Sequence, residues 1–190
     1  MKRFKVGNAE VIIGKLPPYL YPGQNIFDEL WALHPEEFPT IKMYNKNIHI
    51  PRWQQAYGVN YFFSQQVSEA LPVPDSLMPY LEWAKQYNNL FNGILLNWYD
   101  SDLKHYIGKH KDSEVGLVKN SAIITISVGA DRIFRMRELG KSGFDDVVVS
   151  NGDVIVIPWE TNKSFTHEVP YLAKYPGKRI SITIRAFEND

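Results

Sequence analysis

The sequence contains no cysteine in 190 residues. This absence excludes disulfide bonds, thiolate nucleophiles and zinc sites built from thiolates. A metal ion bound by this chain would therefore need histidine and carboxylate ligands. The five His and 21 Asp and Glu residues are the side chains that can supply them.

Long hydrophobic runs and an excess of one charge are missing as well. No apolar stretch approaches the roughly 20 residues that a membrane-spanning helix requires, so no membrane partner is expected. The opening MKRFKVGNAEVIIG is interrupted by Glu10 and Gly14 and lacks the pattern of a signal peptide, which makes an intracellular location the expectation. With 21 basic and 21 acidic residues, attraction to nucleic acid would have to come from local basic stretches such as 42–52 and 132–141. Solvated surface charge is the alternative explanation for both stretches.

The composition is that of a folded protein, and the length favours one domain over residues 1–190. Hydrophobic residues make up 44% of the chain and aromatic residues 14%, which is enough to bury a core. Helices are expected over residues 24–33 and 75–87. The second helix would be capped by Asp75 and would bury Leu77, Leu81 and Ala84.

Most other segments have the character of strands, being short, β-branched or aromatic and bounded by turn residues. They cover residues 4–16, 41–65, 94–99, 122–128, 133–137, 147–149, 154–157, 165–169 and 179–187. Asn151-Gly152, between two apolar runs, predicts a type I′ hairpin. The fold class is therefore mainly β (α+β), a β-sandwich or jelly roll (double-stranded β-helix) with supporting N-terminal helices.

The last predicted strand, RISITIR, alternates polar and apolar residues. Because side chains on a strand alternate between its faces, one face carries Arg179, Ser181, Thr183 and Arg185. The simplest explanation is a half-buried strand with its polar face in water. Alternatively, the two arginines bind a dicarboxylate, since guanidinium groups pair with carboxylates bidentately. In residues 94–99 the same alternation places Asn97 and Tyr99 on one face.

The stretch HKDSEVG contains His110 two residues before Asp112. The motif alone is weak, because His34-Pro-Glu36 has the same spacing. Addition of His167 from SFTHEVP would complete a set of two imidazoles and one carboxylate, the ligand set of non-haem Fe(II) enzymes.

In combination and in order, several motifs resemble the AlkB-like Fe(II)/2-oxoglutarate-dependent dioxygenases. The motifs are IPRWQQAYG, YFFS, NWY, HKDSE, ISVGADRIF, SNGDVIVI, THEVP and RISITIR. The resemblance as a whole covers roughly residues 41–187. The resemblance implies a jelly-roll oxidoreductase that demethylates alkylated bases in nucleic-acid repair. It also implies a variable extension (1–40), a nucleotide-recognition lid (41–70) and a catalytic core (90–187). The family usually has Asn where this chain has Ser181, which is shorter and offers one donor in place of two.

The resemblance also implies roles for individual residues. The Fe(II) ligands and catalytic residues would be His110, Asp112 and His167. The 2-oxoglutarate site would comprise Asn97, Tyr99, Arg179, Ser181, Thr183 and Arg185, with Arg179 at the far carboxylate and Arg185 toward the metal-side one. The substrate site would comprise Arg52, Tyr57, Tyr61, Phe63 and Glu114. In it Tyr61, Phe63 and His110 would sandwich the flipped base, Glu114 would accept hydrogen bonds from an exocyclic amine, and Arg52 and Tyr57 would contact the phosphate chain or the base.

The implied function is oxidative demethylation of bases such as 1-methyladenine and 3-methylcytosine in DNA or RNA, with release of formaldehyde, succinate and CO2. The chain is expected to act as a monomer, with nucleic acid and 2-oxoglutarate as its partners. Two alternatives stay open: a 2-oxoglutarate-dependent hydroxylase or demethylase of a protein or lipid, and a noncatalytic nucleic-acid binding domain. A hydrolytic zinc site explains the sequence less well, because it would give no role to Arg179 and Arg185.

Overall fold

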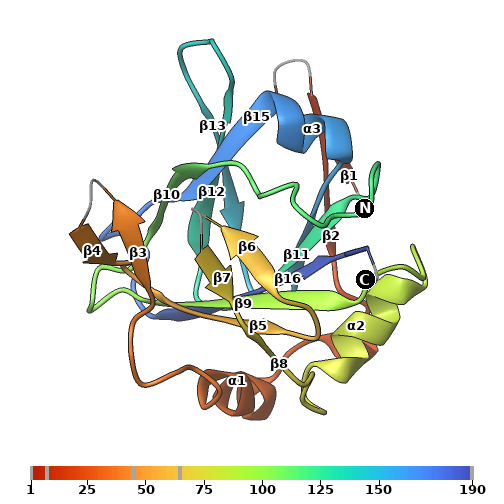
Figure 1. Ribbon diagram of the computed structural model, residues 1–190, viewed down its shortest axis with the longest axis vertical. Coiled ribbons are helices and arrows are strands. Elements are labelled where there is room, and N and C mark those ends of the chain that lie inside the picture. The colour runs from red at the N-terminus through yellow and green to blue at the C-terminus, as the bar shows by residue number, and fades with distance from the viewer. Residues whose placement is uncertain (1, 7–8, 44–45, 64–65, 189–190) are drawn as a thin grey trace.

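Two antiparallel sheets face each other in the computed structural model, which describes residues 2–6, 9–43, 46–63 and 66–188 (Figure 1). Within these ranges the larger sheet has eight strands in the order β1-β2-β14-β11-β16-β9-β5-β8. Their bounds are β1 (Lys2–Val6), β2 (Ala9–Lys15), β14 (Asp153–Ile157), β11 (Ile123–Gly129), β16 (Lys178–Arg185), β9 (Gly93–Asp100), β5 (Trp53–Tyr57) and β8 (Ala70–Leu71). All neighbours are antiparallel except β5 and β8, which run parallel.

The smaller sheet has four strands in the described part of the chain, in the order β10-β15-β12-β13. They are β10 (Ile107–His110), β15 (Phe165–Val169), β12 (Arg132–Glu138) and β13 (Asp145–Val149). Two further pairs stand apart from both sheets: β3 (Thr40–Met43) with β4 (Lys46–His49), and β6 (Tyr61–Phe63) with β7 (Gln66–Ser68). This two-sheet arrangement is the one predicted for a jelly roll.

Helices cover the outer face of the larger sheet, below it in Figure 1. They are α1 (Gln24–Trp31) and α2 (Met78–Lys85); α3 (Trp159–Ser164) and a 3-10 turn (Pro18–Leu20) lie elsewhere. Leu30 of α1 and Leu77, Leu81 and Ala84 at α2 are buried against Ile180, Ile182 and Ile184 of β16. The indole nitrogen of Trp98 donates to the carbonyl of Leu30 over 2.8 Å, which ties α1 to β9. The predicted supporting helices and their buried residues are confirmed.

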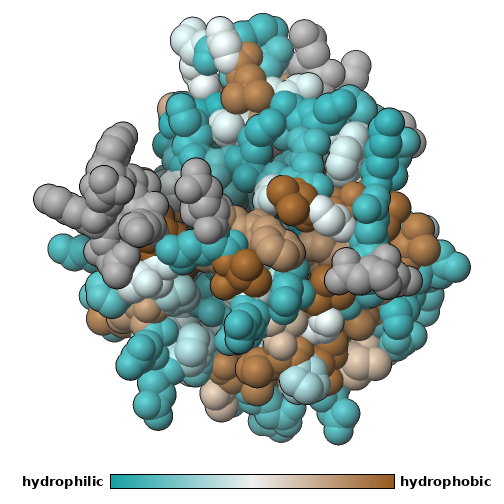
Figure 2. Space-filling model, viewed as in Figure 1, coloured by the Kyte–Doolittle hydropathy of each residue, from teal (hydrophilic) through white to brown (hydrophobic). Residues whose placement is uncertain are grey.

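Space between the sheets is filled at one end by a second apolar cluster. Residues of the larger sheet such as Tyr99, Ile123 and Ile155 pack there against Phe134 and Phe165 of the smaller one. The other end stays open as the cavity described below. Figure 2 shows the face of Figure 1 as a surface, with hydrophilic residues predominating in its upper part and hydrophobic residues across its middle.

Two local predictions were wrong. Asp75 does not cap α2: it lies in a turn, the cap position is Leu77, and the amides of Leu77 and Met78 donate to the carbonyl of Pro74. Asn151-Gly152 does not form a hairpin, because β13 pairs with β12 whereas β14 pairs with β11 and β2. The turn instead carries the chain from one sheet to the other.

The chemistry of this turn explains the Asn-Gly pair differently. Gly152 has a φ of +74°, and Asn151 is not among the described residues with positive φ. One positive φ at the third position is typical of a type II turn. The Asn151 side chain accepts from the amide of Gly129 and donates to the carbonyl of Pro22. It therefore joins three segments that are distant in the sequence.

Part of the predicted N-terminal extension (1–40) belongs to the larger sheet. The strand-like opening is two antiparallel strands, and β2 continues the sheet alongside β14. None of the helices in the described ranges combines the length and the apolar character that crossing a bilayer requires.

Replacement of Ile182 by Ala tests the packing of β16 against the helices. Ile182 is fully buried. We expect the free energy of unfolding to fall by about 2–5 kcal/mol, because the substitution leaves a cavity. Urea unfolding followed by circular dichroism measures the change. Val148→Ala, at a 47% exposed position, is the control and should change stability by less than about 0.5 kcal/mol. Equal effects of the two variants would contradict this assignment of the core.

Candidate active site

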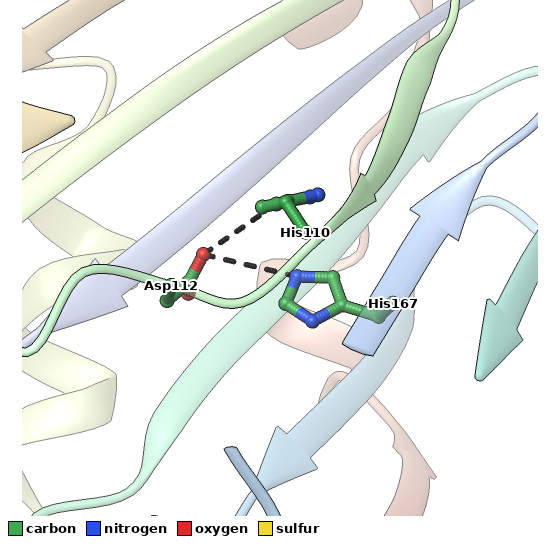
Figure 3. A group of neighbouring side chains, drawn as sticks. All are labelled: His110, Asp112 and His167. Atoms are coloured by element: carbon green, nitrogen blue, oxygen red, sulfur yellow. Dashed lines mark ion pairs between the residues drawn. The ribbon is translucent and has the colours of Figure 1, made fainter. Parts of the chain in front are cut away.

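The pairing of β10 with β15 brings two histidines together. His110, the last residue of β10, is the register partner of His167 in the middle of β15, and their ring centroids are 4.3 Å apart. Asp112 follows β10, and its Oδ1 lies 3.7 Å from Nε2 of each histidine. Figure 3 shows the carboxylate directed at both rings. One ligand atom from each residue lies within 4.8 Å of the other two, so the group can hold a metal ion.

Hydrogen bonds orient His110 and Asp112. Nδ1 of His110 lies 2.8 Å from the carbonyl of Gly108, so it must donate, and Nε2 is left with a lone pair for a metal. Asn162 of α3 accepts from the backbone amide of Asp112 and donates to its carbonyl. Arg185 donates to Asp112 Oδ2 from Nε and Nη2 over 3.2 and 2.7 Å, which leaves Oδ1 to face the histidines.

The electrostatics suit a cation. Burial alone would raise the pKa of Asp112, but the positive charge of Arg185, followed by the electrostatic influence of His167 and His110, outweighs it and lowers that pKa to about 2. Burial, and then the neighbouring His110, lower the pKa of His167 to about 3, and burial also lowers the pKa of His110. One anionic carboxylate beside two neutral imidazoles is the donor set of a facial Fe(II) site. The residues present therefore fit the predicted metal.

The rival pair His34 and Glu36 lies elsewhere. The ring of His34 stacks on Trp53 at 4.4 Å between centroids. It belongs to an aromatic cluster with Trp31. Its motif is therefore structural, and HKDSE is the motif that reaches the metal group.

A cavity of about 370 Å³ extends from this group between the sheets. The larger sheet contributes a row of polar side chains in register across four strands: Ser127 (β11), Ser181 (β16), Asn97 (β9) and Gln54 (β5). The predicted alternation is confirmed, since all the predicted 2-oxoglutarate residues, Asn97, Tyr99, Arg179, Ser181, Thr183 and Arg185, line the cavity. The apolar residues between them face the helices.

Arg179 has guanidinium donors that no other described residue accepts from. It is 1% exposed; its Nη2 donates to Ser127 Oγ over 2.9 Å, and its guanidinium lies 5.2 Å from the centroid of the Tyr99 ring. Its Nε and Nη1 have no partner within the described residues. A buried guanidinium with unused donors is costly until an anion arrives. This end of the cavity therefore fits a carboxylate of a small dicarboxylic acid.

Arg185 lines the cavity next to Asp112, on the metal side, and its contact with the metal-side carboxylate of 2-oxoglutarate stays a prediction. The structure engages it with Asp112 and with Tyr61, whose ring centroid lies 4.6 Å from the guanidinium. It thus orients a ligand of the metal.

The lid residues Tyr61 and Phe63 line the cavity, as predicted, with their rings stacked at 5.8 Å and 15°. Burial, and then the charge of Asp112, raise the pKa of Tyr61 to about 12. Phe62 and its register partner Val67 are exposed on the other side of this hairpin. Ile41 and Ile50, also within the predicted lid, complete the apolar wall.

Three substrate predictions need correction. Tyr57 does not line the cavity, because alternation along β5 turns it into the core beneath the helices. Glu114 is exposed and does not line the cavity, where Lys111 and Ser113 stand instead. Arg52 lines the cavity and is only 8% exposed, so of its two predicted partners the base suits its position and a phosphate chain at the surface does not.

The basic stretch 132–141 is not a free cationic patch. Arg132 is buried and donates to the backbone carbonyls of Asp131, Tyr175 and Gly177. Arg135 pairs with Asp146 at 2.6 Å, and Arg137 with Glu168 at 3.0 Å. In the other stretch, side chains 42–47 lie outside the described residues.

Sequence reasoning missed four residues of the site: Gln54, Ser127, Phe134 and Asn162. Gln54 has the same strand parity as Arg52, so the pattern of IPRWQQAYG could have revealed it. Phe134 stacks on His167 at 5.3 Å. Ser127 and Asn162 meet their partners only through tertiary structure.

Comparisons with known proteins agree with this geometry. The model of the 2OG-Fe(II) oxygenase superfamily matches residues 35–185. Similar proteins include DNA oxidative demethylase ALKBH2 of Homo sapiens, 29% identical over 161 residues that cover 76% of this chain and 60% of that protein. Another is alpha-ketoglutarate-dependent dioxygenase alkB homolog 3 of Rattus norvegicus, 28% identical over 154 residues that cover 74% of this chain and 51% of that protein. The chain thus spans between 51% and 65% of the length of the relatives that it matches.

A solved structure, "The structure of OsALKBH1", covers 92% of this chain and 97% of its own with a TM-score of 0.58. At 13% identity this likeness concerns the fold alone. It agrees with the predicted jelly roll.

Removal of the Asp112 charge should abolish tight metal binding. We expect Asp112→Asn to bind Co(II) or Mn(II) at least about 100-fold more weakly than the unaltered chain. Mutation of a residue that merely hydrogen-bonds to a metal ligand already lowers metal affinity by about 10–100-fold. Isothermal titration calorimetry of the metal-free protein measures this affinity. Asp75→Asn, the same change at an exposed turn, is the control. Unchanged affinity in the Asp112 variant would remove it from the ligand set.

Proposed function

The chain belongs to the 2OG-Fe(II) oxygenase superfamily, and from that premise we propose that it is an AlkB-type oxidative demethylase of N-alkylated nucleobases in DNA or RNA. As an AlkB-like member of the family it is a dioxygenase that uses Fe(II) and 2-oxoglutarate. The observation that carries the proposal is one cavity into which the metal ligands, the unpaired donors of Arg179 and the stacked pair Tyr61–Phe63 all open.

His110, Asp112 and His167 would hold the metal, and Arg185 would keep one oxygen of Asp112 turned toward it. Arg179 would bind the far carboxylate of 2-oxoglutarate, with Tyr99, Asn97, Ser181 and Thr183 along the row beside it. Ser127 accepts a hydrogen bond from Arg179 and so helps to position it. The bound iron and 2-oxoglutarate, with O2, supply the oxidising power that hydroxylates an N-methyl group, which then leaves as formaldehyde while succinate and CO2 form.

The lid side of the cavity provides flat surfaces for a base. A methylated base in a duplex must leave the stack before its methyl group can approach the metal. Tyr61 and Phe63 would contact one face of the flipped base, with the imidazole of His110 opposite. Arg52 lies within the same wall. Bases such as 1-methyladenine and 3-methylcytosine belong to the proposed substrate class.

An oligonucleotide assay tests the proposal. The purified protein, with Fe(II), 2-oxoglutarate and methylated DNA or RNA as single strands and duplexes, should release formaldehyde and succinate in equal amounts. The Asp112→Asn variant should release neither, since it lacks a ligand. Mass spectrometry follows the loss of the methyl group, and a pool of methylated peptides runs in parallel.

Two results would contradict the proposal. Turnover confined to peptides would indicate a protein demethylase. Oligonucleotide binding without succinate formation would indicate a noncatalytic binding domain.

Replacement of Arg179 by Gln should act on 2-oxoglutarate selectively. We expect the KM for 2-oxoglutarate to rise about tenfold or more, because hydrogen bonds to charged groups contribute about 1.5–3 kcal/mol each. Initial rates of succinate formation measure it. Arg137→Gln, at an ion pair outside the cavity, is the control. A KM unchanged in the Arg179 variant would place the carboxylate elsewhere.

A further inference from the structure

Arg52 holds two carboxamide side chains by their oxygens. Its Nε donates to Oδ1 of Asn97 over 2.7 Å and its Nη2 to Oε1 of Gln54 over 3.0 Å. Gln54 and Asn97 are register partners on β5 and β9, so one guanidinium reaches both. A guanidinium can only donate hydrogen bonds, and the oxygen of each amide must therefore face it. This contact fixes which way both amides point.

The consequence is a wall that presents N–H groups. Gln54 is 4% exposed and lines the cavity, and its Nε2 has no partner within the described residues. A buried amide with both donors unused is costly, so the site favours a ligand that brings an acceptor to it. Because the row runs from β11 to β5, Gln54 lies at its lid end, whereas Ser127 lies at the Arg179 end. The acceptor therefore belongs to the substrate rather than to 2-oxoglutarate.

Charge reinforces this selectivity. Four cationic side chains line the cavity: Arg52, Lys111, Arg179 and Arg185. Asp112 is the lone carboxylate among the described lining residues, and it is engaged by Arg185 and aimed at the histidines. Glu114, the acid that could have faced an amine, is exposed outside the cavity. Among the described lining residues there is thus no free negative group for a cationic base.

Methylated bases divide into two kinds at the edge that must approach the metal. In 3-methylthymine and 3-methyluracil, carbonyl oxygens flank the methylated nitrogen on both sides, and the base is neutral. In 3-methylcytosine one flank is an amine, in 1-methyladenine the flanking substituent is an amine, and both bases carry a positive charge at neutral pH. A carbonyl beside the methylated nitrogen can accept a hydrogen bond from an N–H group of the protein. An amine at that position is itself a donor and cannot.

We propose that Gln54, oriented by Arg52, is a specificity-determining residue that donates a hydrogen bond to the carbonyl oxygen at C4 of the base, the position at which 3-methylcytosine carries its amine. The enzyme then prefers neutral, carbonyl-flanked bases to cationic, amine-flanked ones. This inference rests on the proposed function and narrows its substrate class.

The test compares 3-methylthymine with 3-methylcytosine in oligonucleotides of identical sequence. The chain with its own Gln54 should show the higher kcat/KM on 3-methylthymine. Gln54→Glu keeps the shape and lets one oxygen accept from Arg52 while the other presents an acceptor. We expect it to shift the ratio of the two kcat/KM values toward 3-methylcytosine by about tenfold or more, as for one exchanged buried hydrogen bond.

Two further variants separate selectivity from stability. Gln86→Glu adds the same charge at an exposed residue after α2 and should leave the ratio unchanged. Gln54→Met removes the donor without adding an acceptor, and should lower turnover of 3-methylthymine without raising that of 3-methylcytosine. Fluorescence anisotropy of the metal-free variants with both oligonucleotides gives a binding ratio that does not depend on turnover. A variant that had only lost packing would bind both oligonucleotides more weakly by the same factor.

The outcomes are distinct. A 3-methylthymine preference that both Gln54 variants erode supports the assignment. A 3-methylcytosine preference, or a ratio that neither variant moves, overturns it while the demethylase function stands. Absence of turnover on every methylated base overturns the proposed function, and this inference falls with it.

Discussion

The pleat of β16 is the constraint on which the rest of the site depends. Its isoleucines enter the core beneath α1 and α2, and this burial forces Arg179, Ser181, Thr183 and Arg185 to the other face. A shift of register by one residue would exchange the two faces and bury the arginines under the helices. The apolar core thus fixes where the guanidinium groups stand.

The two arginines of β16 solve the problem of a buried charge in different ways. Arg185 has Asp112 as its partner and is balanced within the protein. Arg179 has a serine hydroxyl and an aromatic face, which do not neutralise it. Arg185, whose charge is balanced, orients a residue of the metal site. Arg179, whose charge is not balanced, carries a desolvation cost that a bound anion would offset.

Strand alternation could be predicted from the sequence, and contacts between distant segments could not. The faces of β16 and β9 follow from residue order alone, and so do the buried positions of α2. The motif order also identified the three metal ligands, although the distance between His110 and His167 depends on the pairing of β10 with β15, and β10 itself was not predicted as a strand.

The wrong predictions share a physical cause. Tyr57 lies an odd number of residues after Arg52, which directly precedes β5, so the alternation along the strand turns it to the other face. Glu114 follows the metal motif without a strand to aim it. Asn151-Gly152 has the composition of a hairpin turn, yet the strands on either side find other partners because the two sheets compete for them. In each case the local sequence indicated the chemical character of the residue but not the direction in which its side chain or strand points.

Because β6 and β7 pair with neither of the two main sheets, the residues that line the cavity come from two separate parts of the fold. Metal ligands and anion-binding residues stand on or beside strands of the main sheets, whereas the stacked rings of Tyr61 and Phe63 stand on a detached hairpin. Sequence change in that hairpin can reshape what enters the cavity without disturbing the residues proposed to hold the metal and 2-oxoglutarate. One wall of metal- and anion-binding residues can in this way be combined with different recognition surfaces.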